Sequence, residues 1–312
     1  MKHRVLFAAA LSAIVLSSIS LAQSVDIPVL KGPYLGQKPP GLTPEVFAPG
    51  VVSTGAHEFA GSFSPDGREY YFTRRESRQS PTLIMVTRCV DGTWTAPEPA
   101  TFNATAAGPN AMSFEPMVTP DGRRLYFTSD RPRAGQAGPP GPPQLNIWYV
   151  ERAGDGWGAP QDAGAPFNPM QVMYVSAARS GTIYTMDISQ GPAGAAIAVL
   201  KPTASGYGAP ERLGPPVNDG SPSMYPIVSP DESYLIFSRM RPGEAIDQVL
   251  FVSYRNADGS WGEPRALDLG MRAGTPCVSP DGKYLFFSGG ERGKGDIYWV
   301  SAEILRSPAQ TR

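Results

Sequence analysis

Five copies of one short turn sequence divide this 312-residue chain into units of similar length. The copies are FSPDG at 63–67, VTPDG at 118–122, ARSG at 178–181, VSPDE at 228–232 and VSPDG at 278–282. A β-rich run follows each copy: YYFT at 70–73, LYFT at 125–128, IYTM at 183–186, LIFS at 235–238 and LFFS at 285–288. Counted at the proline or its equivalent, residues 65, 120, 179, 230 and 280, the steps are 55, 59, 51 and 50 residues. A period of that size predicts a solenoid, a propeller or an array.

The last repeat gives the order of elements within one unit. A short strand at 275–279 leads into the SPDG turn, in which proline fixes φ and glycine accepts positive φ. A second strand at 284–288 and a third at 296–301 are apolar at nearly every position, as expected of strands that are buried on both faces. Earlier repeats add a short fourth strand that contains proline, a residue tolerated at a sheet edge, at 91–97, 155–160, 205–210 and 258–264.

Four antiparallel strands in about 50 residues form the blade of a β-propeller. A β-helix repeats at a shorter period, and a β-sandwich would alternate apolar and polar residues. We therefore predict an all-β chain with a single β-propeller, five blades of four strands, and at most a short helical turn near 302–306. The last repeat lacks its fourth strand, and the segment TPEVFAPGVV at 43–52 resembles the fourth-strand fragment at 96–102. We expect this N-terminal strand to close the ring on the last blade and to protect its edge.

The first residues have the pattern of a secretory signal peptide. A basic start at 1–4 precedes an apolar stretch at 5–16 and the small-residue site SLA at 20–22. Cleavage near Ala22 predicts a periplasmic or secreted protein. The expected organisation is a signal peptide at 1–22, an extended segment at 23–42, the propeller at 43–305 and a tail at 306–312. No second long apolar run follows, so we expect no membrane span.

Charge and cysteine content narrow the partners and the chemistry. Removal of Lys2 and Arg4 leaves 25 basic residues against 28 acidic ones, which gives no reason to expect nucleic acid or an anionic membrane as a partner. Export would permit a disulfide. However, Cys277 falls on a central strand and Cys89 toward the rim, so we expect two free thiols. We also expect a monomer without cofactor.

The SPDG turn, the aromatic strand after it, the DIYWV strand at 296–300 and the D-G-x-W turn resemble the TolB-type β-propeller repeat of exported bacterial proteins. The resemblance covers about residues 43–305, and four of the five copies keep the Pro-Asp pair. It implies a periplasmic or secreted binding or scaffold role, with some catalytic relatives among propeller glycosidases and lyases. The best-known member has six blades and an extra N-terminal domain, so its partners are not transferred to this chain.

Strand order assigns the loops to two faces of the propeller. The SPDG and D-G-x-W turns share one face, whose repeated chemistry indicates a structural role. The loops of the other face vary, as a binding face would. Three candidates, Glu115, Tyr174 and Tyr225, each stand five residues before the turn proline or its equivalent and should occupy matching places at the channel mouth. The binding residues predicted on this face are Glu58, Arg74, Glu115, Asp130, Arg131, Tyr174, Asp187, Tyr225 and Arg239.

Three classes of function are compatible with such a face. The first is a non-enzymatic binding or scaffold protein that recognises a protein or a glycan. The second is a carbohydrate-active hydrolase or lyase that uses paired carboxylates, with Glu58, Glu115 and Asp187 as candidates. The third is an envelope scaffold without a small ligand. His57 alone remains after processing, so we expect no histidine-based metal site, and we assign no catalytic residue.

Overall fold

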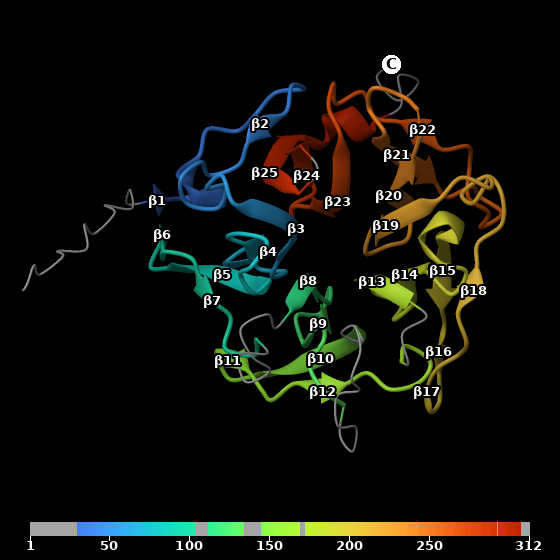
Figure 1. Ribbon diagram of the computed structural model, residues 1–312, viewed down its shortest axis with the longest axis horizontal. Helices are drawn as coiled ribbons and strands as arrows, with labels where there is room; N and C mark the ends of the chain where they lie inside the picture. Colours follow the sequence, from blue (N-terminus) through green and yellow to red (C-terminus); the bar gives the residue numbers. More distant parts are fainter. Residues whose placement is uncertain are drawn as a thin grey trace, which may run out of the picture.

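Five small antiparallel sheets form a ring around a central axis (Figure 1). The computed structural model describes residues 30–103, 112–133, 145–168, 172–241, 243–291 and 293–306. The predicted signal peptide and nearly all of the predicted tail lie outside these residues. The first strands, which lie nearest the axis, are β3 (His57–Phe63), β8 (Ser113–Val118), β13 (Val172–Ala177), β19 (Ser223–Val228) and β23 (Ala273–Val278).

The second and third strands carry the apolar runs. The second strands are β4 (Glu69–Arg75), β9 (Arg124–Ser129), β14 (Ile183–Asp187), β20 (Tyr234–Met240) and β24 (Tyr284–Glu291). The third strands are β5 (Leu83–Val90), β10 (Asn146–Ala153), β15 (Ala196–Leu200), β21 (Gln248–Tyr254) and β25 (Lys294–Ser301). Their side chains fill the spaces between neighbouring blades in five apolar clusters. The predicted all-β propeller of five blades is thus confirmed.

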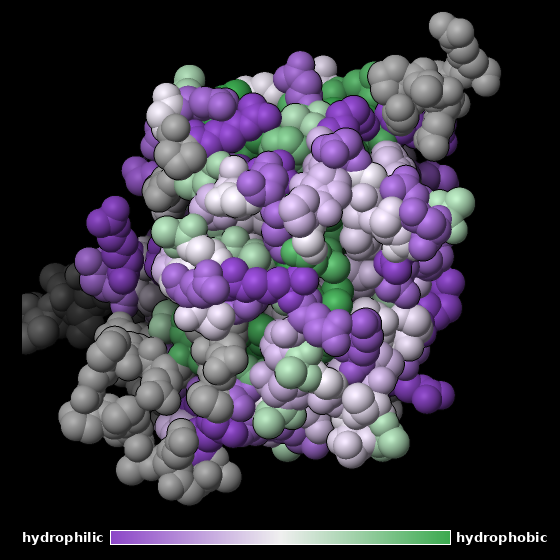
Figure 2. Space-filling view, turned by 90° about the vertical axis from the view of Figure 1, so that its right-hand side faces the viewer, coloured by the Kyte–Doolittle hydropathy of each residue, from purple (hydrophilic) through white to green (hydrophobic). Residues whose placement is uncertain are grey.

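The outermost strand of the blades is short, and in blades one and two it is split. Blade one ends in β6 (Thr93–Trp94) and β7 (Glu98–Pro99), and blade two in β11 (Gly156–Trp157) and β12 (Gln161–Asp162). Blade three has β18 (Glu211–Arg212) beside a hairpin of β16 (Pro202–Thr203) and β17 (Gly206–Tyr207), and blade four has β22 (Arg265–Ala266). An Ala-Pro pair between the two pieces explains the split in blades one and two, because proline donates no hydrogen bond to a ladder. The rim seen in Figure 2 is largely hydrophilic, with small apolar patches.

The N-terminal segment closes the ring, as predicted. Strand β2 (Glu45–Val46) pairs with β25 and supplies the missing fourth strand of blade five, with Glu45 opposite Trp299. Strand β1 (Leu30–Lys31) pairs with β6 of blade one, so the segment joins the first and last blades. The 3₁₀ turn η1 (Pro33–Gly36) lies between these strands, and η3 (Pro192–Gly194) and η4 (Ala302–Leu305) are the other described helical turns.

The N-terminal segment makes the same side-chain contact with blade five that the connections between blades make elsewhere in the ring. Asn103, Asn168 and Asn218 each bond both the N–H and the C=O of an isoleucine on the third strand of their own blade. In the N-terminal segment Ser53 does the same with Ile297 of blade five, accepting from its N–H and donating to its carbonyl. Residues before β3 therefore complete blade five in the way that residues 100–103 complete blade one.

Gly61 of β3 makes a close contact with Tyr70, which is buried in the apolar cluster between blades one and five. Tyr70 is fully buried, and its hydroxyl has no hydrogen-bond partner among the described residues. A Cβ on Gly61 would overlap this hydroxyl and lie 2.7 Å from Cζ of the ring. We expect Gly61→Ala to lower the free energy of unfolding by about 1–3 kcal/mol through overpacking. Tyr70→Phe should raise it by about 1 kcal/mol, since it removes an unpaired buried polar group.

Urea denaturation of the two single variants and of the double variant would measure these effects. The free energy of unfolding should fall less in the double variant than in Gly61→Ala alone, because the Tyr70→Phe change removes the oxygen that the new methyl group meets. If Gly61→Ala lowered the free energy of unfolding equally in the parent and in the Tyr70→Phe variant, the proposed contact would be contradicted.

Candidate functional site

The five first strands bulge at the same place and so form a ring of matching positions around the axis. The bulge residues are Ala60, Glu115, Tyr174, Tyr225 and Thr275, all with positive φ between 40° and 58°. Each pairing of a first with a second strand shifts register there. A bulge re-aims a side chain, and positive φ is costly for residues other than glycine. The predicted equivalence of Glu115, Tyr174 and Tyr225 is present in the structure, with two further members.

Tyr174 reaches across the channel at this level. Its hydroxyl donates to the carbonyl of Pro276 at 2.9 Å, which links blade three to blade five. Its ring lies edge-on to that of Tyr225, with centroids 5.2 Å apart. Tyr174 is buried, with 5% of its surface exposed. This side chain therefore spans from blade three to blade five, and we call it the floor of the pocket that it lines.

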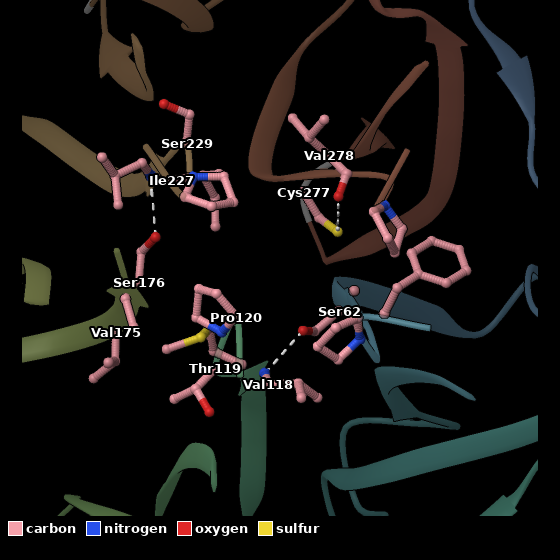
Figure 3. Close-up of a pocket in the computed structure, with 18 of the residues that line it drawn as sticks. Ser62, Val118, Thr119, Pro120, Val175, Ser176, Ile227, Ser229, Cys277 and Val278 are labelled. Atoms are coloured by element: carbon pink, nitrogen blue, oxygen red, sulfur yellow. Dashed lines mark hydrogen bonds between the residues drawn. The ribbon is translucent and has the colours of Figure 1, made fainter. Parts of the chain in front are cut away.

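A pocket of about 300 Å³ lies between this floor and the SPDG turns. Figure 3 shows its wall, which is built from the first strands and the turns that follow them. Ser62 accepts the N–H of Val118, and Ser176 accepts that of Val228, so these two serines join adjacent blades. Four prolines and one arginine, all at the turn position that defines the repeat, surround the opening: Pro65, Pro120, Arg179, Pro230 and Pro280.

Glu115 is the acidic side chain among the described residues that line this pocket. It is 7% exposed and accepts a hydrogen bond at Oε2 from the Thr128 hydroxyl, 3.1 Å away. Burial raises the pKa of Glu115 to about 7, an effect that outweighs the hydrogen bond from Thr128. The channel therefore holds a carboxyl group that gains or loses its proton near neutral pH.

Cys277 also lines the pocket, and it is not activated for nucleophilic chemistry. Burial raises the pKa of its thiol to about 12, so the thiol stays protonated at neutral pH. Cys277 and Cys89 are both free, in agreement with the prediction of two unpaired thiols. Cys277 lies on the first strand β23, as predicted, whereas Cys89 lies near the end of the third strand β5 and not outside that strand toward the rim.

Three of the predicted binding residues make one and the same structural contact. Arg74, Arg131 and Arg239 follow or end second strands, and each donates to backbone carbonyls of the connection that leads into its own blade. Each guanidinium also lies 5.1–5.3 Å from the ring of a phenylalanine on its own second strand. The sequence signal of this role is an arginine that follows the apolar run of the second strand by one to three residues in three of the repeats.

The acidic residues predicted for the same face are also held by neighbours. Glu58 is fully buried, accepts from Thr54 and pairs with Arg74 at 3.0 Å. Asp187 pairs with Arg212 at 2.7 Å, and its other oxygen caps the N–H of Ser189. Asp130 accepts the N–H of Met112, the residue before β8. The structure therefore brings Glu115 and Tyr174 together in the pocket and places these other residues in contacts between strands and blades.

Within the described ranges, no three His, Cys, Asp or Glu side chains are grouped so that they could hold a metal ion. No helix in that part of the chain is long and apolar enough to cross a membrane. His57 accepts the N–H of Gly295 through Nδ1, at the seam between blades one and five. Burial, together with Arg75 and Arg272, lowers its pKa.

No protein-family model matches the chain, and no curated protein matches it. Solved structures do. A TolB candidate from Agrobacterium tumefaciens is 16% identical, with 76% of this chain aligned to 72% of that one and a TM-score of 0.48. TolB from Acinetobacter baumannii is 15% identical over 80% of this chain, at a TM-score of 0.48, and this chain spans 52% of its length. A thermostable family-43 glycoside hydrolase is 13% identical over 79% of this chain and 90% of that one, at a TM-score of 0.51.

These identities carry information about the fold alone. The β-propeller predicted from the repeats is shown by the five blades of the structure itself.

Proposed function

We propose that this protein is an exported, non-enzymatic β-propeller that binds a protein or glycan partner. The observation that carries the proposal is the pocket at the centre of the ring, which Tyr174 lines and which contains the buried carboxyl group of Glu115. A buried ionisable group in a concave site is costly to retain and is typical of functional sites. The pocket volume of about 300 Å³ suits a small polar group, such as a sugar unit or one side chain of a partner.

Catalysis by a hydrolase or lyase is the second candidate, and one observation favours it. A carboxyl group with a pKa of about 7 can serve as a general acid at neutral pH. Glycoside hydrolysis commonly needs a second carboxylate close to the first. The other two candidates, Glu58 and Asp187, are bound to Arg74 and Arg212 and do not line the pocket. Binding is therefore the better supported function.

The predicted variable face remains a competing location for the site. The nine predicted residues include Glu115 and Tyr174, which the pocket shares, and seven others that do not line it. A variant that fills the pocket can separate the two locations. Ile227 is half-buried and lines the pocket wall (Figure 3), so a larger side chain there should obstruct the pocket without a change of charge.

We expect Ile227→Trp to weaken binding of the true partner at least about tenfold, because a ligand group could no longer enter the pocket. A glycan-array screen, together with cross-linking of the protein in envelope extract, would identify ligands and map their contacts. Val90→Trp is the matched control, since Val90 is 56% exposed at the end of the third strand β5 and does not line the pocket. Unchanged binding by Ile227→Trp, with cross-links at the face of Asp130 and Arg239, would place the site there instead.

A further inference from the structure

A second hollow, of about 640 Å³, lies between blades two and three and shares part of its wall with the central pocket. Thr119, Pro120, Ala177 and Arg179 line both of them. The hollow lies on the face of the SPDG turns, and we call it the arginine groove after four of its lining residues: Arg123, Arg124, Arg152 and Arg179. A ligand that leaves the pocket opening on this side would therefore enter a positively charged surface.

Two of the four arginines are fixed in place by neighbouring side chains. Arg124 donates through Nε and Nη2 to Glu151 and lies over the ring of Tyr149, 4.8 Å from its centroid. Arg152 pairs with Glu69 at 2.6 Å and stacks on Trp157 at 3.9 Å. Such contacts hold a guanidinium in one orientation, so little freedom remains to be lost when a ligand binds.

The other two arginines, Arg123 and Arg179, are exposed. Neither guanidinium has a hydrogen bond or an ion pair within the described residues. Arg179 occupies the turn position that is proline in the four other repeats. Its backbone N–H donates to the carbonyl of Pro230, which fixes the backbone of Arg179, and the residue lines both the pocket and the groove. The departure of the third repeat from the SPDG pattern thus places a free cation where the pocket meets the groove.

The remaining lining side chains favour one class of ligand. Asp121 and Glu151 supply acceptors next to the arginines, and Tyr207 adds a half-buried aromatic ring. Ala177, Ala178 and Ile183, the aliphatic lining residues, are buried and offer no recess for an apolar anchor of a peptide. Guanidinium groups bind carboxylates in planar, two-contact geometry. Acceptors beside them suit the hydroxyl groups of a sugar.

We propose that the arginine groove binds a carboxylate-bearing oligosaccharide, with one sugar unit in the central pocket and acidic units along Arg179 and Arg123. The inference rests on the proposed binding function and names its ligand class. It also assigns an orientation to the bound ligand. Its hydroxyl groups face Glu115 at the floor, and its carboxylates face the arginines outside the opening.

The test uses trigalacturonic acid as the probe and its methyl ester as a neutral ligand of almost the same shape. Isothermal titration should detect binding of the acid that weakens as NaCl is raised, and binding of the ester that is at least about tenfold weaker. Arg179→Gln and Arg123→Gln should each weaken binding of the acid about tenfold and leave the weak binding of the ester unchanged.

Arg68→Gln is the matched control. Arg68 follows the turn of blade one as Arg123 follows the turn of blade two, it is exposed, and it does not line the groove. Its substitution should change binding of the acid less than twofold. Melting temperatures of all three variants should equal that of the parent, since the substituted side chains are exposed.

The outcomes separate this inference from the proposed function. Equal binding of acid and ester, reduced by Ile227→Trp but not by Arg179→Gln or Arg123→Gln, would overturn the groove assignment and leave the pocket function standing. Binding of an acidic peptide in preference to the saccharide would overturn the ligand class. Failure of both probes to bind would also overturn the inference. The glycan-array and cross-linking screen would then still test whether the pocket binds a partner.

Discussion

Phe47→Ala should lower the free energy of unfolding by about 3–5 kcal/mol, the cost typical of removing a buried phenylalanine from a core. Phe47 is fully buried where the N-terminal segment fills the space between blades one and five. Its ring lies 4.9 Å from that of Phe286, 5.2 Å from Trp299 and 5.5 Å from Tyr70. The substitution would leave a cavity at the one seam of the ring that is closed by distant parts of the chain.

Denaturation in urea and calorimetry would measure the loss, and we expect the melting temperature to fall by on the order of 10 °C. Leu42→Ala in the same segment is the control. Leu42 is 60% exposed, so its substitution should change the free energy of unfolding little. Deletion of Thr43–Val52 should have a larger effect still. It would uncover the edge of β25 and cause association, detectable by size-exclusion chromatography. A Phe47→Ala variant as stable as Leu42→Ala would contradict closure by packing.

The fold could be predicted because each repeat carries its own local signals. Proline, aspartate and glycine define the tight turn, and continuous apolar runs define strands buried on both faces. The circular closure was predictable for the same reason, since 43–52 resembles a fourth strand and the last repeat lacks one. The split of the outer strands in blades one and two was less evident. The proline that marked the rim strand also interrupts it.

The contacts of the charged residues were harder to predict. The sequence predicts a binding role for Arg74, Arg131 and Arg239 because they follow second strands and so belong to the face whose loops vary. Their actual partners are backbone carbonyls of the preceding connection, together with aromatic rings of their own blade. Whether such an arginine faces solvent or a carbonyl depends on how two blades pack, which no local pattern encodes. That the same residue type recurs in three repeats was the available signal.

The central pocket could not be predicted from the turn sequences alone. Its opening is surrounded by repeated turn residues, which indicate structure, and its floor depends on one contact between residues 102 positions apart, Tyr174 and Pro276. The alignment of Glu115 with Tyr174 was visible in the sequence, but the channel-spanning direction of Tyr174 was not. Arg179 was visible as the departure of one repeat from its pattern. A binding role for Arg179 could be inferred only from the structure, which shows the arginine groove beside it.

Glu115→Gln should make the protein more stable at alkaline pH and leave it unchanged at acidic pH. The pKa of Glu115 is raised to about 7 in the folded state from an ordinary value of 4.5. Between these two pH values the folded protein binds more protons than the unfolded chain, so its free energy of unfolding falls as pH rises. The total loss through Glu115 is on the order of 3 kcal/mol above pH 7. Glutamine carries no titrating proton and still accepts from Thr128.

Urea titrations at pH 5, 6, 7 and 8, followed by tryptophan fluorescence, would compare the variant with the parent. The difference in free energy of unfolding should be about 1 kcal/mol or less at pH 5 and grow to about 3 kcal/mol by pH 8. Other titrating groups are common to both proteins and cancel in this difference. Glu263→Gln, at an exposed position outside the pocket, should show no such trend. A constant difference across the range would contradict a buried carboxyl group with a raised pKa.

The same variant connects stability to the proposed function. If Glu115 served packing alone, a glutamine that stabilises the protein would be neutral or favourable for every property. A pocket that uses the carboxylate to accept hydrogen bonds from a ligand predicts the opposite for binding: Glu115→Gln should weaken it by about tenfold at pH 8, where the parent is ionised, and much less at pH 5. A substitution that raises stability and lowers affinity over the same pH range marks a residue retained for its site rather than for the fold.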